Sequence, residues 1–296
     1  MRSDNRLLII AAASTLALTA AASRSATVYA LNGLARPLDG QDALIRFDSS
    51  NPAGYTTIGT TGVNNIGFGG LDFDESGNLW AYASYFKNTG GAAAGLYKIN
   101  PATGVATAQG NPGLQSLQDI AWNPVDNTMY GINSQNNVSR LYKINLNSGV
   151  VSPVGILQGL PTQQHVMSFA IDSTGSFFIH EMNSDRIYKG STLSLSQLYQ
   201  LPADTNFSQG MTIDWSNGDT GYHAAVGYGV YPHYFSRLNT FSADGSSYVE
   251  GAEFGPELPD GLPPVECGDL AIMPIPAPST GLVLMGLAPM VMRRRR

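Results

Sequence analysis

The sequence predicts an all-β protein built from a repeated unit of four antiparallel strands. Three observations lead to this prediction. The 296 residues include 33 Gly and 14 Tyr but only 13% charged residues, a composition that favours strands and turns over helices. Two stretches that begin 45 residues apart, 96–110 and 141–155, are nearly copies of each other. The two ends of the repeat region, which spans roughly residues 28–273, supply complementary strands of one four-stranded unit.

Each of the two copies has the pattern of a β-hairpin. The segments LYKINPATGVATAQG and LYKINLNSGVVSPVG carry alternating Tyr and Ile, a turn with Gly, and a second strand rich in Val, Thr or Ser. A further hairpin pattern, of an apolar strand, a polar turn and an aromatic strand, recurs at 70–84, 119–133, 168–182 and 210–226. Two hairpins give four strands per unit, and a period of 40–50 residues is typical of β-propeller blades.

In this recurring hairpin an Asp or Asn closes the first strand. The four residues are Asp74, Asn123, Asp172 and Asp214. A side-chain oxygen at this place can accept backbone N–H groups of the turn, as in an Asx-turn. We therefore predict turn caps here rather than metal ligands.

The ends of the repeat region predict how the ring closes. Residues 28–33, 43–50 and 54–60 supply the second, third and fourth strands of a unit without a first strand, and 266–273 supplies a first strand alone. Pairing the two removes the open sheet edges. With units starting near Gly67, Leu117, Val166 and Gln209, the sequence predicts five blades, the alternative being six blades if the long unit 210–266 is divided.

The repeated pattern apolar-Asp-x-x-Gly-x-apolar-aromatic resembles the broad class of NHL-type and quinoprotein-like propeller repeats. The resemblance spans roughly residues 28–273. It implies a fold only, because propellers serve as lectins, scaffolds, hydrolases and lyases.

The N-terminus has the layout of a secretory signal peptide. Arg2 and Arg6 precede an apolar run, 7–22, that ends in small residues. We expect export, with residues 1–22 removed and residues 23–273 forming the propeller.

The charge balance and the single cysteine exclude several classes of protein. Without 1–22 and 274–296 the chain keeps ten basic and 21 acidic side chains, a net charge near −11. Such a chain does not follow a phosphate backbone, so nucleic acid is excluded as a partner. Cys267 cannot form an internal disulfide and is expected to be a small buried strand residue.

The C-terminal segment 274–296 predicts a short membrane anchor. A Pro-rich linker precedes 281–292, which carries no charge and spans about 18 Å as a helix, less than the roughly 30 Å hydrocarbon core of a bilayer. Four arginines follow, and they can act as a cytoplasmic stop.

This tail resembles a PEP-CTERM sorting signal. The matching residues are Pro276, Pro278, Ser279 and Thr280 in the motif and Arg293, Arg294, Arg295 and Arg296 in the terminal cluster, while Ala277 stands where the family has Glu. The resemblance implies an exported protein held transiently at the inner membrane. An exosortase-like enzyme would then cleave it, and the protein would pass to the cell surface or extracellular matrix.

The innermost strands suggest a ligand site at the propeller axis. Aligning the first strand of each unit places Asp269, Gly70, Asp119, Ser168 and Gly210 at one level. Two carboxylates among three small residues would leave an open acidic mouth for sugar hydroxyls or a divalent cation, and no other cofactor is implied. If Asp119 and Asp269 instead bind backbone amides, they are structural caps, and the site belongs in the aromatic loop with Tyr228, Tyr231 and Tyr234.

Two classes of function remain open. The first is a non-catalytic surface or matrix protein that binds an extracellular polysaccharide or protein. The second is an exported carbohydrate-active enzyme, which would need a carboxylate pair such as Asp119 with Asp269, or Asp72 with Glu181. The sequence carries no GxSxG, Walker or Rossmann motif and no paired-histidine metal motif.

Overall fold

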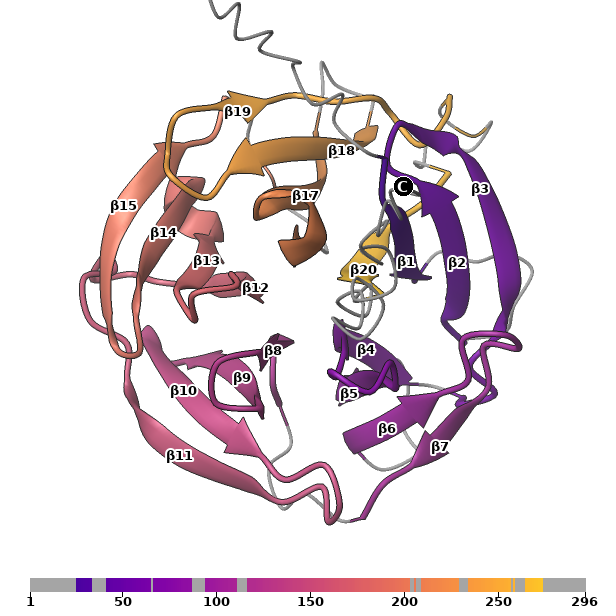
Figure 1. The fold of residues 1–296 in the computed structure, drawn as a ribbon, viewed down its shortest axis with the longest axis horizontal. Coiled ribbons are helices and arrows are strands. Elements are labelled where there is room, and N and C mark those ends of the chain that lie inside the picture. Colours follow the sequence, from indigo (N-terminus) through magenta and orange to yellow (C-terminus); the bar gives the residue numbers. More distant parts are fainter. Residues whose placement is uncertain are drawn as a thin grey trace, which may run out of the picture.

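The protein is a five-bladed β-propeller in the computed structural model. The structure describes residues 25–33, 41–64, 66–86, 94–110, 116–202, 205, 209–228, 234–256, 258 and 264–273. Five four-stranded antiparallel sheets surround a common axis, and each forms one blade (Figure 1). The prediction of five blades is confirmed, and the six-blade alternative is wrong.

Each blade runs from the axis outward in the order of its strands. Blade 1 contains β20 (Cys267–Ile272), β1 (Thr27–Asn32), β2 (Ala43–Asp48) and β3 (Asn51–Thr60). Blade 2 contains β4 (Ile66–Phe73), β5 (Leu79–Phe86), β6 (Gly95–Ile99) and β7 (Ala106–Ala108). Blade 3 contains β8 (Asp119–Asn123), β9 (Thr128–Gln135), β10 (Val138–Ile144) and β11 (Val151–Ile156).

Blades 4 and 5 each include a short 3-10 turn beside their inner strands. Blade 4 contains β12 (Val166–Ile171), β13 (Phe177–Glu181), η1 (Met182–Ser184), β14 (Arg186–Ser191) and β15 (Ser194–Gln200). Blade 5 contains β16 (Gly210–Asp214), η2 (Trp215–Asn217), β17 (Thr220–Tyr228), β18 (Tyr234–Ser242) and β19 (Tyr248–Val249).

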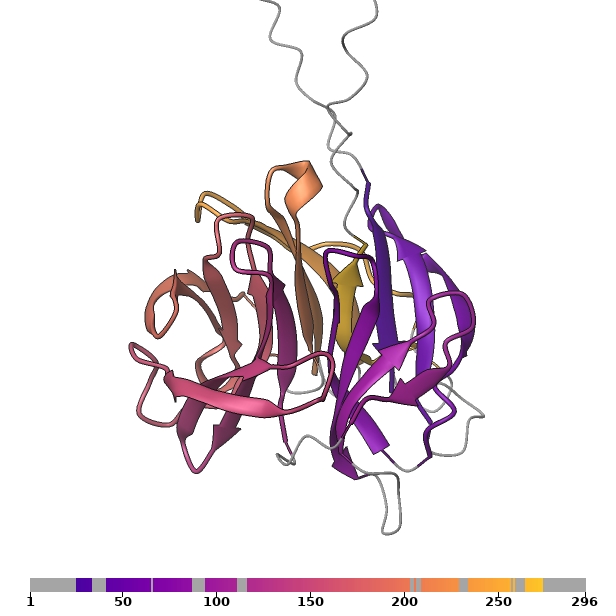
Figure 2. The same cartoon turned by 60° about the horizontal axis from the view of Figure 1, so that its bottom comes forward.

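Blade 1 closes the ring by joining the two ends of the repeat region. The C-terminal strand β20 lies innermost and pairs antiparallel with β1, Val28 opposite Ile272 and Leu31 opposite Asp269. Both ribbon views place β20 beside β1 (Figures 1 and 2). The predicted closure is therefore confirmed, because β1 has β20 on its inner side and β2 on its outer side.

The four predicted turn caps are confirmed. Asp74 accepts the N–H groups of Ser76 and Asn78, each at 2.9 Å. The other three residues make the same kind of contact: Asn123 with Val125, Asp172 with Thr174 and Ser176, and Asp214 with Ser216. These caps fix the turn between the first and second strands of blades 2–5, so the repeat is visible in its hydrogen bonds as well as its sequence.

The core lies between neighbouring blades. Aromatic pairs bridge three of the junctions at centroid distances of 5.3–5.8 Å: Tyr29 with Phe73, Tyr130 with Phe177, and Phe178 with Phe241. Such edge-on and tilted pairs add specificity to the apolar burial. Cys267 is fully buried, as expected, and burial raises the pKa of its thiol.

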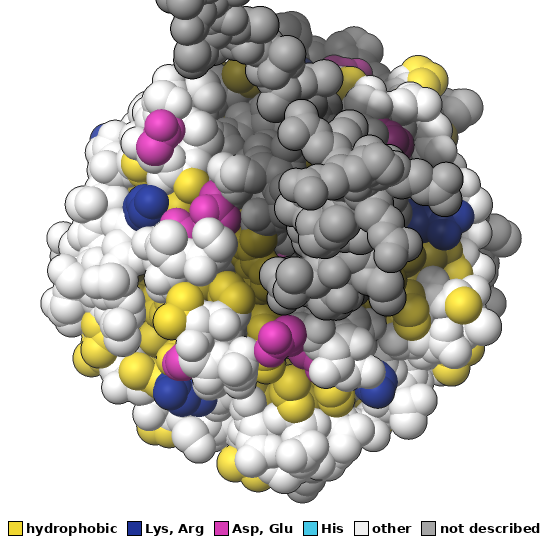
Figure 3. Space-filling view, in the orientation of Figure 1, with side chains coloured by type: hydrophobic (Ala, Val, Ile, Leu, Met, Phe, Trp, Pro, Cys, Tyr) yellow, Lys and Arg dark blue, Asp and Glu magenta, His cyan; other side chains and the backbone are white. Residues whose placement is uncertain are grey.

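The predicted signal peptide, 1–22, and sorting tail, 274–296, lie outside the described residues. None of the described helices is long and apolar enough to cross a membrane. On the face in Figure 3, the described Lys and Arg side chains are spread around the rim rather than gathered in a patch.

Candidate functional site

Five residues of the innermost strands meet at the axis at the level predicted from the repeat. Two of them are glycines with no room for a side chain. A Cβ atom on Gly70 would lie 2.7 Å from the backbone nitrogen of Ile120, and one on Gly210 would lie 2.5 Å from the Cα atom of Asp269. The space that these glycines leave is filled by neighbouring inner strands, at Asp119 and Ile120 beside Gly70 and at Asp269 and Leu270 beside Gly210.

Asp119 and Asp269 are fully buried and bind backbone amides. Asp119 accepts the N–H groups of Ile120 and Phe169, and Asp269 accepts those of Leu270 and Leu71. The expected open acidic mouth is therefore wrong at this level, because five strands converge too closely. The contacts are those of structural caps.

The same kind of bond links three successive pairs of blades. Asp269 of blade 1 accepts an N–H of blade 2, and Asp119 of blade 3 accepts one of blade 4. Between them, Asp72 of blade 2 accepts the N–H of Trp122 in blade 3 at 2.7 Å. A carboxylate that accepts a main-chain N–H across a junction fixes the register of two inner strands that share no ladder.

Burial sets the protonation of these acids. It raises the pKa of both Asp119 and Asp269, and the neighbouring Asp269 charge raises that of Asp119 further. The two side chains also share a hydrogen bond, which raises the pKa of Asp119 and lowers that of Asp269. The two carboxyl groups therefore hold one proton between them, so that one of the pair stays neutral. Burial also raises the pKa of Asp72, to about 7.

The other predicted site residues lie in different surroundings. Ser168 is fully buried in β12, and its hydroxyl has no hydrogen-bond partner among the residues that the structure describes. Tyr228 and Tyr234 are opposite each other where β17 and β18 meet, and the Tyr234 side chain is partly exposed. Tyr231, and the side chain of Tyr228, lie outside what the structure describes.

The second carboxylate pair considered for hydrolysis is also committed to the backbone. Glu181 is fully buried and accepts the N–H groups of His165, Asn183 and Ser184. Asp72 accepts two N–H groups, those of Phe73 and Trp122. Among the described residues no three His, Cys, Asp or Glu side chains are grouped so as to hold a metal ion.

Two histidines meet between blades 4 and 5, which the sequence did not indicate. The rings of His180 and His223 are fully buried, with centroids 4.9 Å apart. The His223 ring contacts the side chains of Gln209 and Tyr248, both at 3.1 Å. Burial lowers the pKa of His223 to about 3 and that of His180 well below its ordinary value, so both rings are neutral. In the repeat alignment they stand one position apart in neighbouring units.

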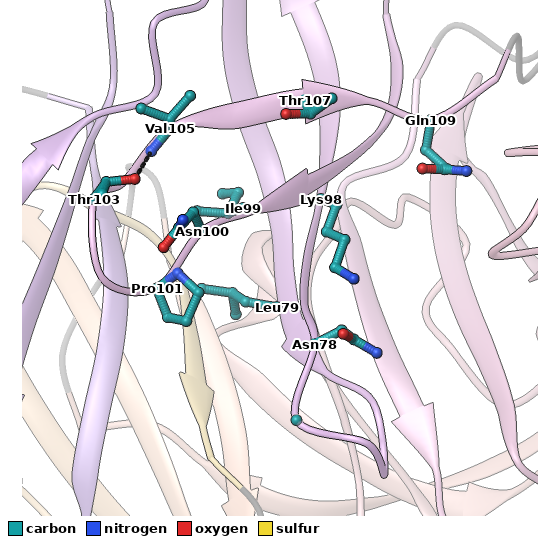
Figure 4. A pocket seen from close by; sticks show the side chains of 11 residues that line it. Asn78, Leu79, Lys98, Ile99, Asn100, Pro101, Thr103, Val105, Thr107 and Gln109 are labelled. Atoms are coloured by element: carbon teal, nitrogen blue, oxygen red, sulfur yellow. Dashed lines mark hydrogen bonds between the residues drawn. The ribbon is translucent and has the colours of Figure 1, made fainter.

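Two adjoining cavities lie over blades 2 and 3, and sequence reasoning missed them. The first, of about 680 Å³, lies over the β6–β7 edge of blade 2. The second, of about 600 Å³, lies at the junction of blades 2 and 3, and its walls include Trp122 and Asn147 of blade 3. Asn78, Lys98 and Gln109 line both, so we treat the two as one groove, called the blade 2–3 groove. Figure 4 shows the first cavity, with the Lys98 side chain extending toward Asn78.

Comparison with known proteins shows the fold and a repeat. A family model described as a repeat of unknown function (DUF6923) matches residues 119–232, from the first residue of β8. A chain from the nidogen/laminin complex is similar over 84% of this chain and 98% of that chain, with 12% identity and a TM-score of 0.50. No curated protein matches the sequence.

Two further solved structures are similar at lower scores. TolB of Acinetobacter baumannii matches over 84% of this chain and 67% of that chain, with 14% identity and a TM-score of 0.49. A candidate 6-phosphogluconolactonase of Bacteroides uniformis matches over 80% and 87%, with 10% identity and a TM-score of 0.44. Likeness at this identity concerns fold alone. The repeat match and the five sheets together define a β-propeller repeat protein.

Proposed function

We propose that this protein is an exported, non-catalytic β-propeller that binds glycans or proteins at the cell surface or in the extracellular matrix. One observation carries the proposal. The acids suited to hydrolysis, Asp119 with Asp269 and Asp72 with Glu181, all accept backbone N–H groups. A general acid or base must be free to exchange a proton with a substrate. The blade 2–3 groove, in contrast, presents carboxamides and a lysine to solvent.

A binding role also agrees with where this fold is found. A similar propeller chain occurs in the nidogen/laminin structure, which is a complex of proteins. The aromatic loop with Tyr228, Tyr231 and Tyr234 is a second contact surface in this proposal, because tyrosines combine an apolar ring with a polar tip. The alternative, an exported carbohydrate-active enzyme, would need an acid pair that is free of such bonds.

Export and sorting form the second part of the proposal. The layout of residues 1–22 supports secretion, and the order of the Pro276–Thr280 motif, the short apolar span and the Arg293–Arg296 cluster supports a PEP-CTERM-like route. In this route an exosortase-like enzyme releases the protein from the inner membrane toward its polysaccharide or protein partner.

The binding role is tested by pairing a binding screen with an assay for turnover. The purified chain is applied to an array of bacterial polysaccharide fragments and to immobilised extracellular proteins, and every ligand that binds is recovered and sized. We expect saturable binding with the ligand recovered intact. Recovery of shortened glycan, or new reducing ends, would support the enzyme instead.

A further inference from the structure

Lys98, in the blade 2–3 groove, differs from the equivalent lysines of the next two blades. Lys98, Lys143 and Lys189 each stand over the second-strand aromatic ring of their own blade, at 5.6, 5.3 and 4.9 Å from the ring centroid. Lys143 also pairs with Asp126, and Lys189 with Asp172. Within the described residues Lys98 has no acidic partner. Its exposed ammonium group is therefore available to an anion.

A buried N–H group on the wall of the groove is also unused. Trp122 lines the groove with only 7% of its surface exposed, and its Nε1 has no hydrogen-bond partner in the described part of the chain. The other groove tryptophan, Trp80, donates its Nε1 to Asp74 at 2.9 Å. A buried donor left unpaired destabilises a protein, and such donors are rare without a functional reason. A ligand oxygen in the groove would supply the missing acceptor.

The remaining polar groups of the groove suit hydroxyl groups. Exposed carboxamides of Asn127, Asn145 and Asn147 line the blade 3 side. The one lining carboxylate, Asp74, already accepts four N–H bonds, from Ser76, Asn78 and Trp80. Free donors thus outnumber free charged acceptors. An ammonium group surrounded by carboxamides matches a ligand that carries a carboxylate and several hydroxyls.

We propose that the blade 2–3 groove binds an acidic glycan, with a uronate carboxylate on Lys98 and ring hydroxyls on the neighbouring carboxamides. This inference rests on the binding role proposed above and names its site and ligand class. Each cavity is within the size range of small-ligand sites, and the two share Asn78, Lys98 and Gln109. The groove therefore has room for a chain of several sugar units.

The test uses the full-length chain and a hexamer of galacturonic acid, with its methyl ester as an uncharged probe of the same ring structure. Binding is measured by calorimetry for the wild type, for Lys98→Gln and for the matched control Lys143→Gln. We expect Lys98→Gln to weaken binding about tenfold, because a charge-assisted hydrogen bond is lost. Lys143→Gln and the wild type should agree within twofold, and added salt should weaken binding of the acid only.

A second variant keeps the test independent of any one substitution. Asn147→Asp places a negative charge on the exposed blade 3 wall. It should weaken binding of the acidic hexamer and leave binding of its ester unchanged. Equal loss in Lys98→Gln and Lys143→Gln, or equal binding of acid and ester, would overturn the site. Competition by hexaglutamate at the same concentration would overturn the glycan assignment and favour an acidic peptide.

The failure of this inference can be told apart from failure of the proposed function. If the wild type ignores the hexamer but binds another glycan or a protein intact, the groove assignment falls and the binding role stands. If the hexamer is cleaved, the non-catalytic role falls, and the Lys98 comparison then reports on a substrate site rather than on a binding site.

Discussion

Asp119 and Asp269 share a hydrogen bond across the propeller axis, although they belong to blades 3 and 1 and are 150 positions apart in the sequence. Each also accepts a backbone N–H from the blade that follows its own. The pair thus joins four of the five blades at a single point. Because only one of two such carboxyl groups can ionise easily in a dry interior, the bond requires a shared proton.

The backbone contacts of this pair predict similar losses of stability for the two equivalent substitutions. Asp119→Asn keeps a donor toward Asp269 but can accept only one of two backbone N–H groups, so we expect a loss of about 1–2 kcal/mol in unfolding free energy. Asp269→Asn likewise leaves one of two backbone N–H groups without an acceptor, so we expect a similar loss. Ser168→Ala, in the same layer, removes an unpartnered buried hydroxyl and should be neutral or slightly stabilising. Urea unfolding measures all three, and a loss of less than about 0.5 kcal/mol in either Asn variant would contradict the capping role of these carboxyl groups.

Asp72 makes stability depend on pH in a defined direction. Its pKa is raised to about 7 in the folded protein, so the unfolded chain releases this proton first as pH rises. The stability that the folded state gains by holding this proton is fully present below about pH 3.8 and is lost as the pH rises to about 7. The partial exposure of Asp72 makes about 4 kcal/mol an upper limit. Unfolding curves of wild type and Asp72→Asn should diverge in their pH dependence between pH 4 and pH 8, and parallel curves would contradict the burial argument.

The histidine pair makes stability depend on pH in the opposite direction, so that stability falls as the pH falls. The pKa of His223 falls to about 3 on folding, so the unfolded chain takes up this proton first as pH falls below about 6.5. Stability from the neutral ring is present above 6.5 and is lost toward pH 3, about 3 kcal/mol between pH 7 and 4.5. His223→Gln should lack this loss in urea titrations across that range. His165→Gln, at a partly exposed histidine, serves as the control and should keep it.

The close approach of the inner strands at the axis predicts that alanine destabilises the protein strongly at one glycine and very little at another. Gly210→Ala would place a Cβ atom 2.5 Å from the Cα atom of Asp269, where only backbone could move. We expect a loss of more than about 2 kcal/mol. At Gly33 the nearest atom to an added Cβ is 3.8 Å away, so Gly33→Ala should stay within about 0.5 kcal/mol of wild type. Thermal unfolding of the two variants measures the contrast.

The tail prediction concerns the four terminal arginines. If Arg293–Arg296 are the cytoplasmic stop, replacing all four with Ser should release the chain early or misorient it, because the apolar span is too short to hold its position alone. Fractionation of cells that express the two forms measures this. Replacement of Lys143 by Ser is a control for changed charge in the propeller. Equal membrane retention of the arginine variant and wild type would show that the arginines are not the stop.

The fold was predictable from the sequence because each blade carries the same local signals. The hairpin copies, the turn caps at Asp74 and its equivalents, and the orphan strand at 266–273 are all patterns within about 50 residues. The level of the axis residues also followed from aligning the repeats. These features depend on neighbours in the sequence, so one chain is enough to recognise them.

The state of the axis and the groove could not be predicted in the same way. Whether Asp119 is buried depends on how closely five strands converge, which is set by side chains absent from Gly70 and Gly210. Two of these features arise across junctions between repeats. They are the contact of His180 with His223 and the position of Lys98 in a cavity that it lines together with blade 3. The alignment of repeats gives equivalent positions within blades but no distances between them.

The position of β20 makes closure of the ring depend on a strand from the C-terminal end of the repeat region. Among the described strands β20 is synthesised last, and it is the innermost strand of blade 1. A product that stops before Cys267 therefore leaves β1 with a free edge and the axis without Asp269. Such an edge is open to pairing with other chains and to proteases. The ring closes only when β20 pairs with β1, so chains that lack β20 can be recognised by the accessible edge of β1.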